Sequence, residues 1–238
     1  MTGAGISGAP SLRNGVKKDT SDLNSTVFQE IPMPVITLPF GPLEANCYIV
    51  HNGRDAVVFD PSDDTDLVLK NLAGNNLTLR AVALTHLHCD HCIGCADLAA
   101  ATGLVPLVGA EDWEERSLLL CKGMCFGMNL KSFDAQVLAP GEVQWGSLSC
   151  RVIHTPGHSA GSLCYYFADL GLVVTGDVLF FRSVGRSDLP GGNGEELMRS
   201  IREKLYVLPG NVMVYPGHGP ETSIGYEAVH NGFCRAQA

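Results

Sequence analysis

The sequence has no excess of positive charge and is sparing with charged residues altogether. Charged side chains make up 17% of its 238 residues, hydrophobic side chains make up 45%, and the net charge is −9. The negative balance argues against an extended basic surface, so we expect no nucleic-acid partner. The hydrophobic content is typical of a globular protein and not of a disordered one.

Long apolar runs are also missing. No stretch approaches the ~20 apolar residues that a membrane-spanning helix needs, so we expect no membrane association. The amino terminus lacks the apolar segment of a secretory signal, which predicts a cytoplasmic protein. We interpret residues 1–24 as a polar, disordered leader and residues 25–238 as a single domain that is long enough to bury a sizeable core.

Cysteine, in contrast, is plentiful, since the chain has nine. Without an export signal, reduced thiols are a better interpretation than disulfides. Cys47, Cys150 and Cys164 lie in apolar, strand-like runs, where buried thiols behave as small hydrophobic side chains. We therefore expect these three residues to pack in the core.

Short apolar segments separated by Gly, Pro and Asp predict a protein with many strands. The predicted strands are Val35–Leu38, Cys47–Val50, Ala56–Phe59, Ala81–Leu84, Val105–Val108, Cys150–His154, Ser162–Phe167, Leu172–Thr175 and Val212–Tyr215. The predicted helices are Asp64–Ala73, Ile93–Thr102, Ala110–Leu119 and Gly194–Leu208. Asp169–Gly171 predicts a hairpin turn. Strands mixed with helices in this way indicate packed sheets covered by helices.

Polar residues of a metal-binding type follow several of these strands. The five residues at such positions are Asp60, His86, His158, Asp177 and His218. If the strand ends lie at one edge, these side chains converge on one point, and rigid strands are good anchors for ligand loops. A Pro-Gly pair can end a strand without any function, and a lone histidine is more often structural. Three Gly-flanked sites together with the segment HLHCDH favour a metal centre.

The segment Thr85–Cys95, THLHCDHCIGC, has the residue types of two metal chemistries. His86 and His88 are two apart and point the same way in an extended segment, so they can chelate one ion. Asp90 and His91 follow after a turn and can bind a second ion. Imidazole and carboxylate ligands suit zinc, iron or manganese.

The cysteines of the same segment allow a sulfur-bound metal instead. Cys89, Cys92 and Cys95 are evenly spaced. In an extended segment Cys89 points away from His88, and the other two begin the following helix. We therefore predict a nitrogen and oxygen site, with a structural role for the cysteines and a redox liability as the alternative.

Taken together, these motifs resemble those of the metallo-β-lactamase superfamily. The matching residues are His86, His88, Asp90 and His91 in HLHCDH, His158 in PGHSAGS, Asp177 in TGD, His218 in YPGHGP and Asp60 after an early strand. The resemblance implies an αββα sandwich of two mixed β-sheets flanked by helices, with a dinuclear site at one edge. It implies two divalent metal ions, zinc in the first place and iron or manganese otherwise.

The resemblance also implies a role for each ligand. His86, His88 and His158 would bind the first metal, and Asp90, His91 and His218 would bind the second. Asp177 would bridge both, and Asp60 would orient the ligand loop from behind. Asp90 and Asp177 are the carboxylates for which we predict a catalytic role.

Within that superfamily, two segments look most like small glyoxalase II-type hydroxyacylglutathione hydrolases. They are GDVLFFRSVGRSDLPGGN and YPGHGPETSIGYE. Longer glyoxalase II enzymes bind glutathione partly through a carboxy-terminal helical region, for which about twenty residues after His218 are too few. Arg186, in VGRSD, aligns with a basic residue that contacts substrate there. The segment Leu118–Met128 is either a cover over the site or an ordinary helix edge.

These features predict a hydrolase that cleaves a thioester such as S-lactoylglutathione by a metal-bound hydroxide. Metal binding lowers the pKa of water from 15.7 toward ~7, and a metal stabilises the oxyanion. The leaving thiolate has a conjugate acid of pKa ~8.5 and departs without a strong general acid. An ester substrate, including a lactone, remains open.

Two alternatives differ from this hydrolase. The first is a glutathione persulfide dioxygenase with a single iron, which would be held by His86, His158 and Asp177. The second is a non-catalytic metal-binding or redox-sensing protein, which the large ligand set disfavours because structural zinc sites are usually closed by four ligands. A β-lactamase is disfavoured by the lack of an export signal.

Overall fold

The computed structural model describes residues 1, 33–41, 43–61, 64–120, 125 and 127–236. The predicted leader falls, apart from Met1, outside the described residues, so the leader and the domain boundary stay predictions. One compact unit, Pro32–Ala238, contains the helices and strands that the structure describes. None of those helices is both long and apolar enough to cross a membrane.

Two six-stranded sheets form the centre of this unit, and they divide the chain in sequence order. The first sheet has the spatial order of the sequence and comprises β1 (Val35–Phe40), β2 (Ala45–His51), β3 (Asp55–Phe59), β4 (Thr78–Ala83), β5 (Leu107–Val108) and β6 (Gln136–Val137). Its first three strands are antiparallel, whereas β3 to β6 are parallel. The sheet is therefore mixed.

The second sheet is also mixed and has the order β14-β13-β10-β9-β8-β7. Its strands are β7 (Gly141–Trp145), β8 (Leu148–His154), β9 (Leu163–Phe167), β10 (Leu172–Gly176), β13 (Met213–Pro216) and β14 (Thr222–Ser223). The pair β10–β13 is parallel, and the other neighbours are antiparallel. A small hairpin, β11 (Leu179–Phe180) with β12 (Ser183–Val184), follows β10.

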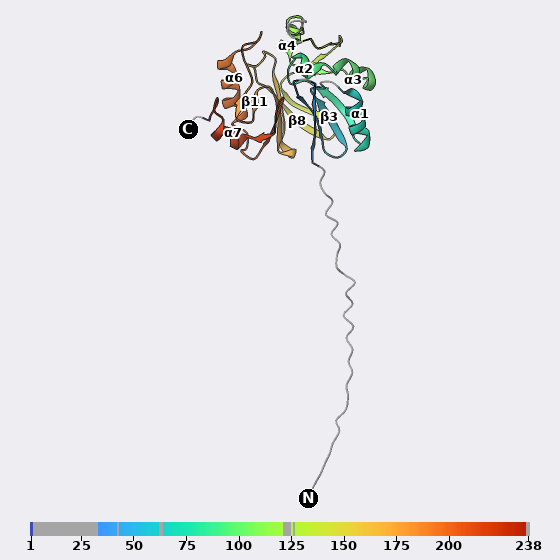
Figure 1. Cartoon of the computed structure of the whole chain (residues 1–238), viewed down its shortest axis with the longest axis vertical. Helices are drawn as coiled ribbons and strands as arrows, with labels where there is room; N and C mark the ends of the chain where they lie inside the picture. Colours follow the sequence, from blue (N-terminus) through green and yellow to red (C-terminus); the bar gives the residue numbers. More distant parts are fainter. Residues whose placement is uncertain (2–32, 42, 62–63, 121–124, 126, 237–238) are drawn as a thin grey trace. The chain divides into compact units, whose positions relative to one another are not determined.

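Helices cover the outer face of each sheet (Figure 1). Those of the first half are α1 (Thr65–Gly74), α2 (Cys89–Cys92), α3 (Cys95–Thr102), α4 (Ala110–Glu114) and α5 (Arg116–Leu119). Those of the second half are η1 (Ala168–Leu170), α6 (Gly194–Ser200), the π-helical turn η2 (Ile201–Leu205) and α7 (Ile224–His230). The layers are thus helix, sheet, sheet and helix, as the predicted αββα sandwich requires.

Three of the four apolar clusters among the described residues fill the spaces between these layers. The central one lies between the sheets and includes Phe59 of β3 and Tyr165 of β9, whose ring centroids are 4.7 Å apart. A second cluster packs Val68 and Leu72 of α1 against the first sheet. The third packs α6, η2 and α7 against the second sheet. Strands β2 and β3 are buried on both faces for this reason, and their apolar runs are continuous.

Most predicted elements are confirmed, with differences that have local causes. The predicted helix Ala110–Leu119 is two short helices, because the backbone leaves the helical conformation at Glu115. The predicted helix Gly194–Leu208 ends at Leu205 after a π-helical turn. The short strands β6, β7, β11, β12 and β14 and the helices α2 and α7 were not predicted, since they are brief or carry weak apolar periodicity.

The cysteines follow the prediction in part. Cys47, Cys150 and Cys164 are buried in the three apolar clusters, as expected. The expectation of reduced thiols is wrong for one pair, because Cys89 and Cys125 form a disulfide with a Cα–Cα distance of 5.2 Å. Their sequence separation of 36 residues concealed this proximity.

Candidate metal centre

The strand ends of both sheets meet at one edge of the sandwich, and the predicted polar residues meet there with them. Asp60 follows β3, and His86 follows β4 in the first sheet. His158 follows β8, Asp177 follows β10 and His218 follows β13 in the second. Parallel strands end at the same edge of a sheet, so each sheet delivers its side chains to the same place. The structure brings all seven residues of the predicted ligand set together.

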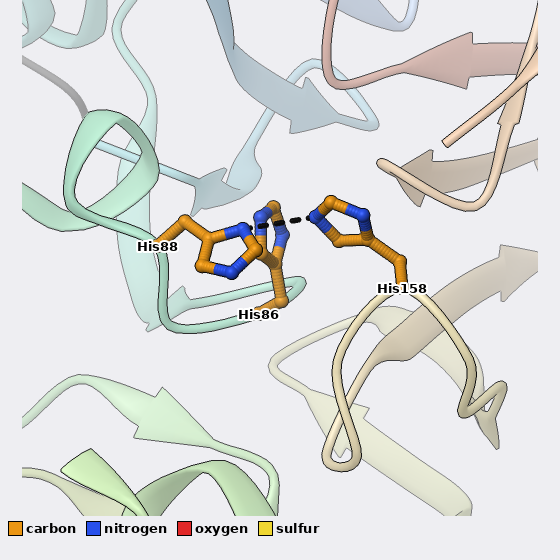
Figure 2. Close-up of side chains that lie close together, drawn as sticks. All are labelled: His86, His88 and His158. Atoms are coloured by element: carbon orange, nitrogen blue, oxygen red, sulfur yellow. Dashed lines mark hydrogen bonds between the residues drawn. The ribbon is translucent and has the colours of Figure 1, made fainter. Parts of the chain in front are cut away.

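The first cluster consists of His86, His88 and His158 (Figure 2). The ring centroids of each pair are 4.6 Å apart. His158 Nε2 lies 2.9 Å from His88 Nδ1. All three residues are buried, with exposed fractions between 1% and 8%. This group has the spacing that one cation bound by three imidazoles requires.

The second cluster consists of Asp90, His91 and His218. His218 Nε2 lies 3.3 Å from both Asp90 Oδ2 and His91 Nε2, and His91 Nε2 lies 3.6 Å from Asp90 Oδ2. The HLHCDH segment can supply both clusters because the helix α2 begins just after His88 and turns the chain. The predicted turn between the two halves of this segment is thereby confirmed.

Asp177 lies between the two clusters. Its Oδ2 atom is 3.6 Å from His158 Nε2, and its Oδ1 atom is 3.5 Å from His91 Nε2. A glycine neighbour makes this position possible, because a Cβ atom at Gly217 would lie 2.1 Å from Asp177 Oδ1. The glycine of the YPGH motif therefore leaves room for the carboxylate.

Asp60 lies behind the ligands, where it contacts Thr85 and His91, and it does not line the cavity. Its backbone has a positive φ of 49°, a conformation that Asp tolerates better than most residues. The carboxylate accepts hydrogen bonds from Thr85 N at 2.7 Å and Thr85 Oγ1 at 2.6 Å. His91 Nδ1 donates to it at 3.0 Å. Asp60 thereby anchors the start of the ligand loop and leaves His91 Nε2 free to act as a ligand.

Three more imidazoles are oriented through their second nitrogen in the same manner. His158 Nδ1 donates to the carbonyl oxygen of Arg186 at 2.7 Å, and His218 Nδ1 donates to that of Leu43 at 3.0 Å. His86 Nδ1 lies 3.0 Å from Thr85 Oγ1. Carbonyl oxygens only accept, so the Nε2 atoms of His158 and His218 carry lone pairs toward the centre. Backbone carbonyls leave no signal in a sequence, so no motif predicts these contacts.

Several atoms of the site have no protein partner. Four buried polar side-chain atoms lack a hydrogen bond in the described part of the chain, and three of them are His86 Nε2, His88 Nε2 and Asp177 Oδ1. Buried polar atoms are normally paired, because leaving them unpaired costs free energy. A cation in this region would pair His86 Nε2 and Asp177 Oδ1, whereas His88 faces His158 through Nδ1. The donor set, nitrogen with carboxylate oxygen, fits zinc, iron or manganese.

Two imidazoles of the first cluster have lowered pKa values. Burial lowers the pKa of His86 far below its usual value and that of His88 to about 3, with the neighbouring imidazoles contributing to both shifts. Both rings are therefore neutral, as metal ligands must be.

The carboxylates have the opposite effect on His91. Burial lowers the pKa of His91, but Asp177, Asp60 and Asp90 outweigh it and raise the pKa to about 10. Burial likewise raises the pKa of Asp90, whereas His218 and His91 outweigh that effect and lower it overall. Negative potential at this point favours any cation, whether a proton or a metal ion.

A cavity of about 600 Å³ opens onto the two clusters. Its walls include the apolar side chains of Leu43, Phe180 and Leu189, and the guanidinium of Arg186. Arg186 is half exposed and donates to both carboxylate oxygens of Asp188, at 2.8 and 2.9 Å. The cavity is large enough for a small-molecule substrate.

Two further predictions concern neighbouring segments. The proposed cover Leu118–Met128 falls partly on residues 121–124 and 126, which are outside the described residues, so its role stays a prediction. The sulfur-bound metal is not supported, because none of the three possible metal-binding groups among the described residues contains a cysteine. Burial raises the pKa of Cys92 and Cys95 well above the usual value, which keeps both thiols protonated.

Comparison with known proteins places this arrangement in a family. The model of the "Metallo-beta-lactamase superfamily" matches residues 40–218. This range includes the six residues of the two clusters and, as the seventh, Asp177.

Curated relatives agree with that match. The chain is 37% identical over 201 residues to a "Probable metallo-hydrolase YqgX" of Bacillus subtilis, covering 82% of this chain and 95% of the relative. It is 29% identical over 218 residues to "Hydroxyacylglutathione hydrolase GloC" of Haemophilus influenzae, covering 87% and 100%.

Among solved structures, TTHA1623 "in a di-iron-bound form" matches with a TM-score of 0.74 and 33% identity. The match covers 84% of this chain and 100% of that one. A protein of the same fold and similar sequence thus binds two metal ions.

Proposed function

Since this chain belongs to the metallo-β-lactamase superfamily, we propose that it is a metal-dependent hydrolase that cleaves a thioester of the hydroxyacylglutathione type. The observation that carries the proposal is the convergence of seven ligand-type side chains, five of which line a cavity. Buried atoms of His86 and Asp177 in this group lack a protein partner. Structural metal sites are closed, whereas catalytic sites face a space that a substrate can enter.

The ligand roles that we propose follow the two clusters. His86, His88 and His158 hold one ion, and Asp90, His91 and His218 hold the other. Asp177, whose oxygens lie 3.6 Å from His158 Nε2 and 3.5 Å from His91 Nε2, would contribute to both. The di-iron form of a similar protein supports two ions. Zinc is the metal we propose, because three imidazoles are a common zinc ligand set.

When bound, two such ions supply a Lewis acid for the substrate carbonyl and lower the pKa of water. The protein supplies the rest. Asp90 and Asp177 balance the positive charge. Asp60 and the carbonyl oxygens of Leu43 and Arg186 keep the imidazoles of His91, His218 and His158, respectively, in one tautomer.

The cavity favours a substrate with one apolar and one anionic part. Leu43, Phe180 and Leu189 offer an apolar wall beside the ligands, and Arg186 offers a positive charge at the mouth. A thiolate leaves readily, because its conjugate acid has a pKa of ~8.5, and the described part of the cavity lining includes no lysine or tyrosine that could act as an acid. A thioester suits this site for that reason. The relative named as a hydroxyacylglutathione hydrolase supports the same substrate class.

The test combines metal analysis with turnover. Protein purified without added metal is analysed for zinc, iron and manganese, reloaded with each, and assayed with S-lactoylglutathione. We expect two ions per chain and metal-dependent thioester cleavage. Loaded protein that cleaves no member of a thioester and ester panel would overturn the proposal.

The same preparations separate the alternatives. Oxygen uptake with glutathione persulfide, at one iron per chain, would indicate a dioxygenase. Opening of a β-lactam without thioester cleavage would indicate a lactamase. Full metal loading without any turnover would indicate a binding or sensing protein.

A further inference from the structure

Asp112 is a buried carboxylate outside the two clusters. It lies on α4, three residues after the N-cap residue Gly109, and its exposed fraction is 0%. Its Oδ1 atom accepts a hydrogen bond from Gly161 N at 2.6 Å. Its Oδ2 atom accepts from Leu87 N and from Ser159 Oγ, each at 2.9 Å. Both oxygens of a fully buried side chain are thus used by three donors.

All three donors belong to the loops that carry the first cluster. Leu87 lies between His86 and His88, and Ser159 directly follows His158. The first loop leaves β4 of one sheet, and the second leaves β8 of the other. One carboxylate therefore joins the two loops, at the point where three imidazoles from different sheets must meet.

The backbone segments around Asp112 are packed so closely that two positions accept only glycine. A Cβ atom at Gly161 would lie 2.4 Å from Asp112 N, and one at Gly109 would lie 2.0 Å from Gly161 O. Both distances are below any real contact, so only glycine fits at either position. The loops are held at van der Waals distance. A backbone hydrogen bond from Leu163 N to Thr85 O, at 2.7 Å, links the same two segments further from the imidazoles.

The charge of Asp112 suits its donors. Burial raises the pKa of Asp112, while the hydrogen bonds from Gly161, Ser159 and Leu87 oppose that shift. Two of the donors are backbone N–H groups, which cannot reverse their role. Hydrogen bonds to an ionised acceptor are about twice as strong as neutral ones.

We propose that Asp112 is a positioning residue that fixes the separation of His88 and His158 and so sets the affinity of the first cluster for its metal ion. The proposal rests on the proposed metal ligands and is independent of the substrate. A partner one step behind the ligands commonly changes metal affinity by roughly 10–100-fold when it is removed. The hydrogen bonds of Asp112 go to Leu87, Ser159 and Gly161 of the ligand loops, so its positioning effect acts through these loops.

The test is an Asp112→Asn variant. The amide keeps the shape of the carboxylate, but its NH2 group faces one of the donors, so at least one backbone N–H loses its acceptor. Zn2+ is titrated calorimetrically into metal-free wild type and variant, with chelator competition for tight sites. A His88→Ala variant identifies the binding step that belongs to the first cluster. We expect that step to weaken by about tenfold or more in Asp112→Asn, and the other step to keep its wild-type affinity.

Asp55 provides a matched control. It is 2% exposed and lies at the opposite end of β3 from Asp60, where it accepts hydrogen bonds from Arg80 Nε at 2.6 Å and from Ser147 N at 2.8 Å. Asp55→Asn removes the same charge from an equally buried carboxylate that touches no ligand loop. We expect this variant to lose stability and to bind both ions with wild-type affinity.

Two results would overturn the proposal. One is wild-type Zn2+ affinity at both steps in Asp112→Asn, and the other is an equal loss in Asp112→Asn and Asp55→Asn, which would indicate a general loss of stability. If Asp112→Asn does not fold, Ser159→Ala removes a single donor, and we expect about threefold weaker binding at the first step only. Unchanged binding in Ser159→Ala would then refute the role. These readouts are separate from turnover, so a failure of the hydrolase assay leaves them interpretable.

Discussion

His158 Nε2 lies 2.9 Å from His88 Nδ1, although 70 residues separate the two histidines in the chain. His158 Nδ1 donates to the carbonyl oxygen of Arg186, so the lone pair of Nε2 points at the other ring. Two imidazoles so arranged either share a proton or face a common cation. The pKa of His88, about 3 because of burial and the neighbouring His158, keeps its ring neutral, as a metal ligand must be.

The first prediction concerns the proposed ligands. His88→Ala and Asp177→Ala should each lose most of the activity, by roughly hundredfold or more, since even partners behind a ligand are worth 10–100-fold. Turnover of S-lactoylglutathione and metal content per chain are measured together. Asp97→Asn, which removes an exposed carboxylate bound to Lys131, is the control and should be neutral. Full activity in either ligand variant would refute the ligand assignment.

The second prediction concerns Asp60. Asn also tolerates the positive φ of this position, so Asp60→Asn changes the charge without backbone strain. The imidazole of His91 then loses the carboxylate that orients it, and the affinity of the second cluster should fall about 10–100-fold. Zn2+ titration measures this, with Asp55→Asn as the control. Wild-type affinity at the second step would contradict an action of Asp60 through His91.

The third prediction concerns metal removal. Ions bound only by the folded state stabilise it by about 4.1 kcal/mol at a concentration of 1,000 Kd. Treatment with a chelator should therefore lower the melting temperature, and added Zn2+ should restore it. The His88→Ala variant should respond less than wild type. A melting temperature that is indifferent to chelator in wild type would count against ions at this site.

The fourth prediction concerns pH and Asp55. Hydrogen bonds from Ser147 and Arg80 hold the pKa of Asp55 below its usual value, which is ~3.9 in the unfolded chain. A group with a lowered pKa in the folded state stabilises that state above the unfolded pKa and loses this effect as pH falls through the folded one. The stability difference between wild type and Asp55→Asn should thus be constant above about pH 5 and shrink below pH 4. Denaturant unfolding across this range measures it, and a difference that grows toward acid would show the sign to be wrong.

The fifth prediction concerns the disulfide. Cys125→Ser should lower the free energy of unfolding by about 2–4 kcal/mol under non-reducing conditions, because the bond closes a long loop. Reductant should remove most of that difference. Denatured wild type should release two more thiols after reduction than before it. An equal number before and after would mean that Cys89 and Cys125 are not bonded.

The sequence predicts those parts of the site in which the same pattern recurs. An apolar strand followed by His or Asp with a glycine beside it occurs at Asp177, His158 and His218, and regular strand direction turns that pattern into convergence. Most strands could also be predicted from the sequence, because buried strands are continuous apolar runs.

Other features were out of reach because they depend on tertiary contact. Asp112 looks like an ordinary polar residue of an amphipathic helix, and only the folded chain brings it to Leu87 and Gly161. The bond between Cys89 and Cys125 is of the same kind. Local pattern contains no information about such partners.

Neither sheet carries a complete set of the proposed ligands. The first contributes His88 and its neighbours, the second contributes His158, Asp177 and His218, and the two sheets correspond to successive halves of the chain. Bound ions would therefore act as cross-links between halves that otherwise meet through side-chain packing and hydrogen bonds such as that from Leu163 N to Thr85 O. Metal binding would therefore require that the two halves have packed together. A partly folded chain with only one sheet formed would be unable to retain its ions.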